Sequence, residues 1–262
     1  MKNKGLIITL IVIFSIIVIL LAAFLTMCLR GKINFGNGFI NFGYKSTNII
    51  FDEQFELEDI KNIEIKQDAG DIIFKETTNN YIQVVLYGDN KEDAQVEFNS
   101  GNLNIDNTHK KRTLFGGSKN DIIIYIPTNY SNEIKIKNDY GKCEIIDLEN
   151  AIVNIDCDAG DVEIGKIKNA TIKCDYGNIE IKEILNRCDI KADCGNIKID
   201  SMSIKENSTI KADLGNVDIN NTNEIYIDTD VDLGKTSINK NNRSAEVTLK
   251  IKCDCGNVTI NN

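Results

Sequence analysis

The stretch Ile190–Ile199 reads Ile-Lys-Ala-Asp-Cys-Gly-Asn-Ile-Lys-Ile, and its central motif, Asp-x-Gly followed by Asn, Asp or Lys, occurs eight times in the chain. The eight glycines are Gly70, Gly141, Gly160, Gly177, Gly195, Gly215, Gly234 and Gly256. From Gly141 onward they are 19, 17, 18, 20, 19 and 22 residues apart. A period of about 20 residues is typical of a stacked architecture, in which neighbouring units complete each other's core.

Numbered from the glycine as position 0, each copy carries two short runs of alternating apolar residues. Position −5 is Ile in seven copies and Thr229 in the other, and position +4 is Ile in seven copies and Phe74 in the first. Positions −3, −1 and +2 are mostly small or apolar as well. This period of two is expected for strands with one buried face, so we assign all five positions to the core.

The residues at the glycine indicate a tight corner between two strands. Glycine tolerates positive φ, and the Asp at −2 is expected to accept a backbone N–H across the bend. The chain between corners is too short for a crossover helix. We therefore predict an all-β fold, a β-solenoid with coils of 17–22 residues in which every strand pairs with its copies above and below. The spacing leaves open whether a coil has two or three sides.

The repeats are regular over residues 131–262 and irregular over residues 50–130, which we take as the first part of the solenoid. A degenerate copy is predicted at Phe98–Ile105, around Gly101, and a strand at Ile122–Ile126 after a polar loop.

Residues 1–30 are predicted to form a transmembrane anchor with a short N-terminal tail. The run from Leu6 to Leu29 is uncharged, and as a helix it would be about 36 Å long, enough to cross a hydrocarbon core of about 30 Å. A cleaved secretory signal is the competing interpretation, because Lys2 and Lys4 precede the run. A second alternative is lipidation of Cys28, in a lipobox-like segment with Met27 in place of a small residue.

Residues 31–49 are rich in Gly and Asn and are predicted to be a tether between the anchor and the β-domain. The short tail before the apolar run favours a cytoplasmic N-terminus and an extracellular β-domain. The predicted location is therefore the cell membrane, crossed once, with the lipid bilayer contacted through residues 6–29.

The net negative charge of the chain argues against anionic partners. Five basic residues and no acidic residue precede Asp52, so the net charge of −9 becomes −14 for residues 50–262. A domain this acidic is unsuited to bind nucleic acid or anionic lipid. Cations or basic partners fit it better.

The cysteines and aspartates have ordinary structural explanations. Six of the eight cysteines stand at −3, −1 or +2, where other copies have Ala, Val, Leu or Ile, so we expect buried thiols, with disulfides or a metal site as the alternatives. The Asp row at −2 is expected to be balanced by Lys at −4, present in six copies; calcium held between coils is the alternative. The single histidine, His109, is expected at the surface. We predict no catalytic, cofactor-binding or metal-binding residues, and no enzymatic activity.

Several short strings occur together in the chain: Ile63-Glu64-Ile65, Gly70-Asp71-Ile72, Ile124-Tyr125-Ile126-Pro127 and the tandem Ile-x-x-Asp-x-Gly-Asn-Ile-x-Ile repeats. In combination they resemble the DUF4097 family of adhesin-like β-solenoid domains, over about residues 50–262. Bacterial members of that family pair an N-terminal membrane helix with a β-solenoid. The resemblance implies a membrane-tethered, surface-exposed binding or adhesion module with a protein or cell-surface glycan as partner. An envelope-stress sensor or scaffold working through protein contacts is the alternative.

The C-terminus suggests a place for such contacts. The chain stops two residues after Ile260, with no capping segment. We therefore predict that the last coil, with Val258 and Ile260, presents an unpaired edge through which the protein self-associates end to end or binds a partner strand.

Overall fold

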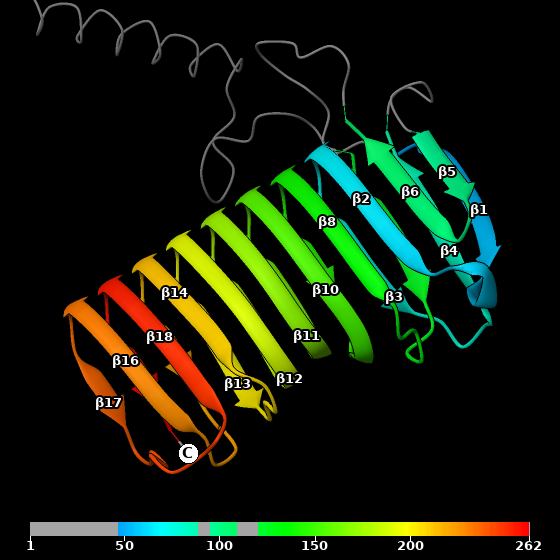
Figure 1. The fold of residues 1–262 in the computed structure, drawn as a ribbon. Helices are drawn as coiled ribbons and strands as arrows, with labels where there is room; N and C mark the ends of the chain where they lie inside the picture. Colours follow the sequence, from blue (N-terminus) through cyan, green and yellow to red (C-terminus); the bar gives the residue numbers. More distant parts are fainter. Residues whose placement is uncertain (1–46, 89–94, 109–119, 262) are drawn as a thin grey trace, which may run out of the picture. The chain divides into compact units, whose positions relative to one another are not determined.

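The computed structural model describes residues 47–88, 95–108 and 120–261, which belong to one compact unit (Figure 1). They form a continuous sheet of 19 strands, with one 3-10 turn, η1 (Leu57–Asp59). The predicted all-β solenoid is confirmed. Within these ranges no helix is long and apolar enough to cross a membrane. The predicted anchor (residues 1–30) and most of the tether (residues 31–49) lie outside the described residues.

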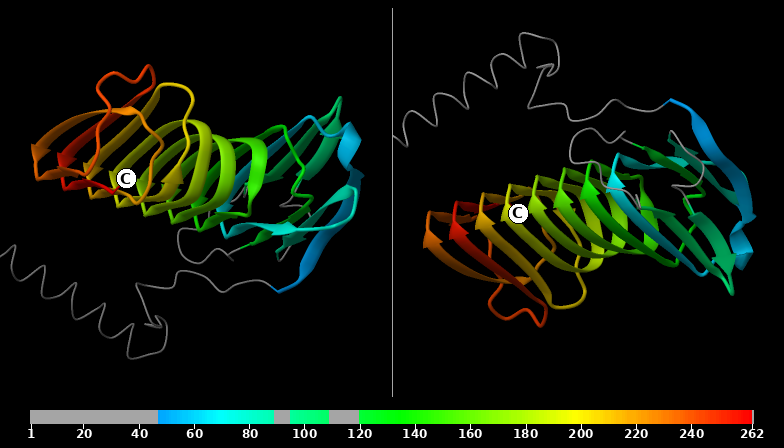
Figure 2. Two further views of the ribbon diagram at one scale, coloured as in Figure 1. Left: turned by 90° about the horizontal axis from the view of Figure 1, so that it is seen from below. Right: turned by 90° about the horizontal axis from the view of Figure 1, so that it is seen from above.

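The sheet folds into two rows of strands joined at the glycine corners (Figures 1 and 2). The row before the corners runs, in spatial order, through β5 (Gln95–Asn99), β6 (Asn102–Asn107), β2 (Asn62–Ala69), β8 (Glu133–Tyr140), β10 (Leu148–Ala159), β11 (Val162–Tyr176), β12 (Ile179–Cys194), β14 (Ser208–Leu214), β18 (Thr248–Cys255) and β16 (Tyr226–Leu233).

The row after the corners runs through β1 (Ile49–Glu56), β4 (Tyr81–Tyr87), β7 (Ile122–Ile126), β3 (Ile72–Glu76), β9 (Cys143–Ile145), the first residues of β11 and β12, β13 (Ile197–Met202), β15 (Val217–Ile219), β19 (Val258–Ile260) and β17 (Thr236–Ile238). In the middle of the stack a short third ladder places Leu148, Ile167, Ile184 and Met202 in one column. Those coils therefore have two main sides and a narrow third one.

The parallel strands stack in register, so equivalent positions form columns. At −5, Ile155 pairs with Ile172 and Ile172 with Ile190, and each is 4% exposed or less. Burying an Ile side chain contributes about 1.5–3 kcal/mol, and the column repeats this contribution in nearly every coil. The uniform Ile at −5 and +4 is thus the continuous core of the solenoid.

The corners need glycine for two reasons. Seven of the eight repeat glycines have φ between +136° and +156°; Gly234 is the exception. A Cβ built on Gly195 would also lie 1.8 Å from the carbonyl oxygen of Gly177, the corner of the adjacent coil. Gly101 has a different role: with Ser100 (φ 53°) it forms the turn of the antiparallel β5–β6 hairpin. The predicted degenerate corner at Gly101 is wrong.

The coils are not stacked in sequence order at either end. The coil of β18 and β19, last in the sequence, lies between the coil of β14 and β15 and the coil of β16 and β17. In the same way, the coil of β2 and β3 lies inside that of β6 and β7. The predicted free edge at Val258 and Ile260 is therefore wrong: both side chains are fully buried, and their strands are paired on both sides.

We call the end at β6 and β7 the capped end and the end at β16 and β17 the open end. At the capped end, β5 adds to β6 and the strands β4 and β1 add to β7, all antiparallel. Phe55 of β1 and Phe98 of β5 meet with ring centroids 5.8 Å apart, which joins the two rows over the last coil. At the open end, β16 pairs with β18 alone and β17 with β19 alone among the described strands.

Candidate functional surface

Parallel bands of side chains run along the stack at the corners, one band for each repeat position, two of them on the outside and one on the inside. The first band consists of ion pairs within single strands. Lys173, Lys191, Lys211 and Lys252 at −4 lie 2.6–2.9 Å from the carboxylate two residues later, which belongs to Asp175, Asp193, Asp213 and Asp254. The Lys191 ammonium, through its hydrogen bond, lowers the pKa of Asp193. The expected pairing of the Asp row with a Lys row is confirmed at these four copies.

The second band is a ladder at +1. The side-chain oxygen of Asn178 accepts a hydrogen bond from the backbone N–H of Asn196 (3.0 Å), and that of Asn196 accepts one from Asn216 (2.9 Å). The same bond links Asp161 to Asn178, Asn216 to Asn257 and Asn257 to Lys235. The side chain at +1 thus binds the backbone N–H of the +1 residue in the neighbouring coil. The four ion-paired aspartates above accept no backbone N–H across the corner, so the hydrogen bond predicted for the Asp at −2 is wrong for them.

The third band lies inside the corner, at −3. Thiols there point at corner carbonyl groups: Sγ of Cys157 lies 3.7 Å and Sγ of Cys174 lies 3.5 Å from the carbonyl oxygen of Gly160. Asn138 does the same with a stronger donor, its Nδ2 lying 3.0 Å from the oxygen of Gly141. A hydrogen bond with Cys143, together with burial, raises the pKa of Cys157 to about 12. Cysteine at −3 is therefore a small apolar residue that also donates weakly to the corner.

All seven cysteines in the described ranges are free, and five of them are buried. The prediction of buried thiols is confirmed for Cys143, Cys157, Cys174 and Cys253, and Cys188, which lies outside these repeat positions, is buried as well. It is wrong for the two at −1, because Cys194 is half-exposed and Cys255 is exposed. The strand bends at the corner, so the −1 side chain leaves the core face.

The −1 side chains together form an exposed apolar column, which we call the corner ridge. Its members pair in register from coil to coil: Tyr140, Ala159, Tyr176, Cys194, Leu214, Cys255 and Leu233. Four of them are strongly exposed, namely Tyr140 (61%), Tyr176 (65%), Leu214 (55%) and Leu233 (70%). With strands about 4.8 Å apart, seven coils extend the ridge over roughly 30 Å. A contiguous exposed apolar surface of this length is typical of an interaction site.

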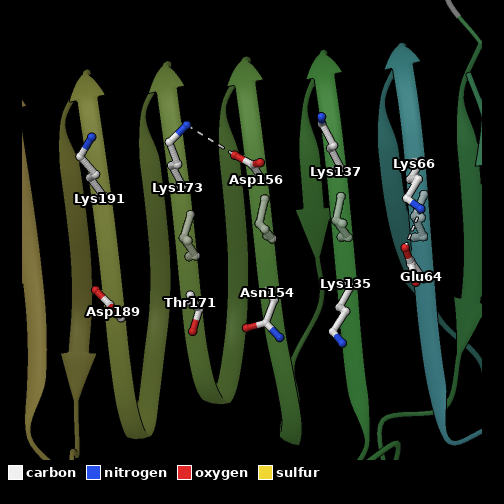
Figure 3. A pocket seen from close by; sticks show the side chains of 14 residues that line it. Glu64, Lys66, Lys135, Lys137, Asn154, Asp156, Thr171, Lys173, Asp189 and Lys191 are labelled. Atoms are coloured by element: carbon white, nitrogen blue, oxygen red, sulfur yellow. Dashed lines mark ion pairs between the residues drawn. The ribbon is translucent and has the colours of Figure 1, made fainter.

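A shallow groove of about 520 Å³ lies beside these bands, on the outer face of the strands from β2 to β12 (Figure 3). Positions −6 and −4 line it and supply five lysines and three acids: Lys66, Lys135, Lys137, Lys173, Lys191, Glu64, Asp156 and Asp189. Lys66 pairs with Glu64 (2.8 Å) and Lys173 with Asp156 (3.7 Å). The groove is thus a locally basic area on an acidic domain.

Two candidates from the sequence, His109 and Cys28, lie outside the described residues. Over the ranges 47–88, 95–108 and 120–261, no cluster of three or more His, Cys, Asp or Glu side chains has the arrangement of a metal site.

Two features were missed in the sequence, the ladder at +1 and the exposure of −1. The signal for the second was present, because the −1 residues range in size from Ala to Tyr, whereas the buried −5 column is almost uniformly Ile. A stacked core requires constant volume, and an exposed ridge does not.

The chain matches the Toastrack DUF4097 family model over residues 60–262. No curated protein matches it. Among solved structures, a "putative adhesin" from Bacteroides fragilis is similar with a TM-score of 0.51 and 14% identity, covering 83% of this chain and 99% of the other. A "putative lipid binding protein" from Parabacteroides distasonis has a TM-score of 0.43 and 12% identity, covering 82% and 98%. At these identities, the Bacteroides fragilis structure supports the fold alone.

Proposed function

Because the chain belongs to the Toastrack DUF4097 family, we propose that it is a non-enzymatic binding or adhesion module, tethered to the membrane and exposed at the cell surface. The corner ridge is the observation that carries this proposal. Tyrosine and leucine side chains exposed in register at every second coil, with Ala or Cys between them, offer a partner a rigid apolar contact line with little entropy to lose.

The charged side chains favour binding over catalysis. They follow the repeat along the stack, and in four copies the carboxylate at −2 is engaged by a lysine of its own strand. Catalysis requires different groups that converge on one reacting atom. A banded surface instead suits an extended partner, such as a protein face or a surface glycan.

The ridge is tested by replacing Tyr140 and Tyr176 together with Ser in the full chain. Both side chains are more than half exposed, so folding should be unaffected while attachment of expressing cells to their target surface falls several-fold. Tyr226→Ser, half-buried and outside the ridge, is the matched control. Equal attachment by the ridge variant and the control would refute the ridge as the contact surface.

The membrane tether rests on the apolar run Leu6–Leu29 and its flanking charges. Protease treatment of intact cells tests the orientation: an extracellular β-domain is cleaved or released, whereas a cytoplasmic one stays intact until the cells are lysed.

Envelope-stress sensing or scaffolding is the second candidate, and the open end favours it, since an unpaired strand edge can bind another polypeptide. Deleting the gene while following an envelope-stress reporter separates the two. An adhesion module leaves the reporter unchanged, whereas a sensor or scaffold alters it.

A further inference from the structure

The open end presents a strand edge that is only partly covered. The backbone N–H of Tyr226 donates to Val247, on the β18 side of β16, so the neighbouring residue Ile227 faces the other way. On that side the backbone N–H of Ile227 donates to Oδ1 of Asn241 (2.9 Å), and Nδ2 of Asn241 donates to the backbone C=O of Ile227 (2.8 Å). Successive strand residues alternate between the two edges, so Thr229 and Val231 also direct their N–H and C=O groups away from β18. The Asn241 side chain thus makes, at Ile227 alone, the two backbone hydrogen bonds that a neighbouring strand would make.

The outer face of this edge strand is acidic. Asp228, Asp230 and Asp232 are all exposed. In four other coils the residue at −4 is a Lys that binds the Asp at −2, but here −4 is Asp230, and Lys252 of β18 is already 2.9 Å from Asp254. The three carboxylates of β16 therefore have no lysine in their own strand, and they face lysines only on the β18 side.

The strand already paired with β16 shows which neighbour fits. In β18, Lys250 lies opposite Asp228 and Lys252 lies opposite Asp230, with apolar residues between them. Opposite charges directly across a strand pair stabilise it, and like charges destabilise it. A second neighbour on the open edge would need the same Lys-x-Lys alternation. Its apolar residues would cover the half-buried Val231 and Ile238.

A second copy of this chain does not provide such a neighbour through its own ends. The outer strands of the capped end carry Asp52, Glu53 and Glu56 on β1 and Glu97 on β5. Two open ends would bring two sets of Asp228, Asp230 and Asp232 together. Both arrangements place like charges across the new strand pair.

We propose that the β16–β17 edge binds an extended segment of a different protein, with Lys or Arg at alternate positions, by adding it as a further strand. The segment pairs with the free edge of β16, in the same way as β16 pairs with β18 on its other edge. This proposal does not depend on the corner ridge, and it replaces end-to-end self-assembly as the role of the terminal coil.

The test uses the full-length chain in detergent and a fluorescent peptide with the sequence of residues 246–261, carrying Cys253→Ser and Cys255→Ser. A second peptide also carries Lys250→Glu and Lys252→Glu. The lysine peptide should bind at least tenfold more tightly than the glutamate peptide. It should also slow amide hydrogen exchange over residues 229–236. Comparable affinity for the two peptides, or no binding up to millimolar concentration, would overturn the proposal.

Protein variants locate the site. Asp228→Asn with Asp230→Asn should weaken binding of the lysine peptide about tenfold. The matched control, Asp156→Asn with Asp189→Asn, changes the same two rows in coils whose edges are already paired, and it should have no effect. An equal loss in the control would show that the peptide binds to general surface charge.

Val231→Pro removes an N–H that points away from β18, and its effect is measured by sedimentation. If the wild-type chain forms oligomers that this variant loses, the occupant is a second copy of the chain and the proposal is wrong.

Discussion

At the capped end three antiparallel strands and a pair of phenylalanines cover the last parallel coil, whereas at the open end the last coil is met by a single asparagine side chain. The two ends also differ in composition. Strand β4 of the cap buries Ile82, Val84 and Leu86 completely, while the outermost coil at the open end has Thr229 where seven other copies have Ile. The capped end is thus covered by additional apolar strands. At the open end a polar residue, Thr229, replaces a core Ile, so less apolar surface is exposed to water.

The comparison also explains the inverted order of the coils. Because β18 and β19 lie between two other coils, both strands are paired on both sides. The edge is left to β16 and β17, which continue in the chain on both sides of the coil and cannot fray as a free terminus does. A polar coil at the edge of the stack limits aggregation through strand edges.

The largest effect is expected at an interior corner. Gly195→Val places a branched side chain at φ +154° and against the carbonyl oxygen of Gly177, held between two coils, and should cost about 4 kcal/mol or more of unfolding free energy. Gly234→Val also meets a carbonyl oxygen, but its φ lies outside the left-handed range and no described coil lies beyond it, so its coil can shift outward. Chemical denaturation should show a loss of about 1–2 kcal/mol there. Equal losses would contradict the difference between interior and edge.

The next effect compares one leucine from each end. Leu86→Ala removes a fully buried side chain from the cap and should cost about 2–5 kcal/mol. Leu233→Ala, at a side chain 70% exposed in the open coil, should change stability by less than about 0.5 kcal/mol. Both are measured by urea unfolding of the same chain. A Leu233 variant as damaged as the Leu86 variant would mean that the open coil is covered.

Thiol reactivity gives a smaller and more local effect. Cys255 is exposed and should be alkylated in the native protein, whereas Cys253, two residues earlier in β18, is fully buried and should react only on unfolding. Mass spectrometry of the labelled peptides distinguishes the two sites, with buried Cys188 as the interior reference. Native labelling of Cys253 at the rate of Cys255 would place β18 at the edge of the stack.

The smallest effect is the pH dependence of the surface ion pairs. Hydrogen bonding to Lys191 lowers the pKa of Asp193 below its ordinary value of 3.8, so the pair stabilises the fold above about pH 4 and its contribution is lost as the pH falls through the lowered pKa. The same bond raises the pKa of Lys191 above 10.5, so the contribution is also lost at high pH. Lys191→Gln should therefore lower the melting temperature slightly between pH 5 and 9 and not at pH 2. A deficit that persists at pH 2 would show that the side chain acts through packing.

Much of this architecture could be predicted from single residues. The uniform Ile at −5 and +4 predicted the core columns, and the Asp-x-Gly motif predicted the corners. The order of the coils could not be predicted, because every copy has nearly the same strand pattern, so Cys253 fits a terminal coil as well as an internal one. Thr229 was the departure that marked the edge coil, and it gains that meaning only beside the strand pairing.

The candidate surface was harder to predict than the fold. Position −1 continues the apolar alternation of −5 and −3, and only the bend at the corner turns Tyr140 and Tyr176 outward. The ladder at +1 depends on contacts about 20 residues away in the sequence, and Asn after Gly is also a common turn residue. The local sequence pattern therefore identified the corner, but it showed neither the exposure of position −1 nor the hydrogen bonds of position +1.

Hydrogen exchange followed peptide by peptide tests the central claim, that the last coil of the sequence lies inside the stack and the coil before it forms the edge. We predict that amides of β18 and β19 exchange as slowly as those of β12. In β16 and β17, amides such as those of Thr229, Val231 and Thr236 should exchange markedly faster. Fast exchange in β18 and β19 with protection throughout β16 and β17 would contradict the account and restore stacking in sequence order.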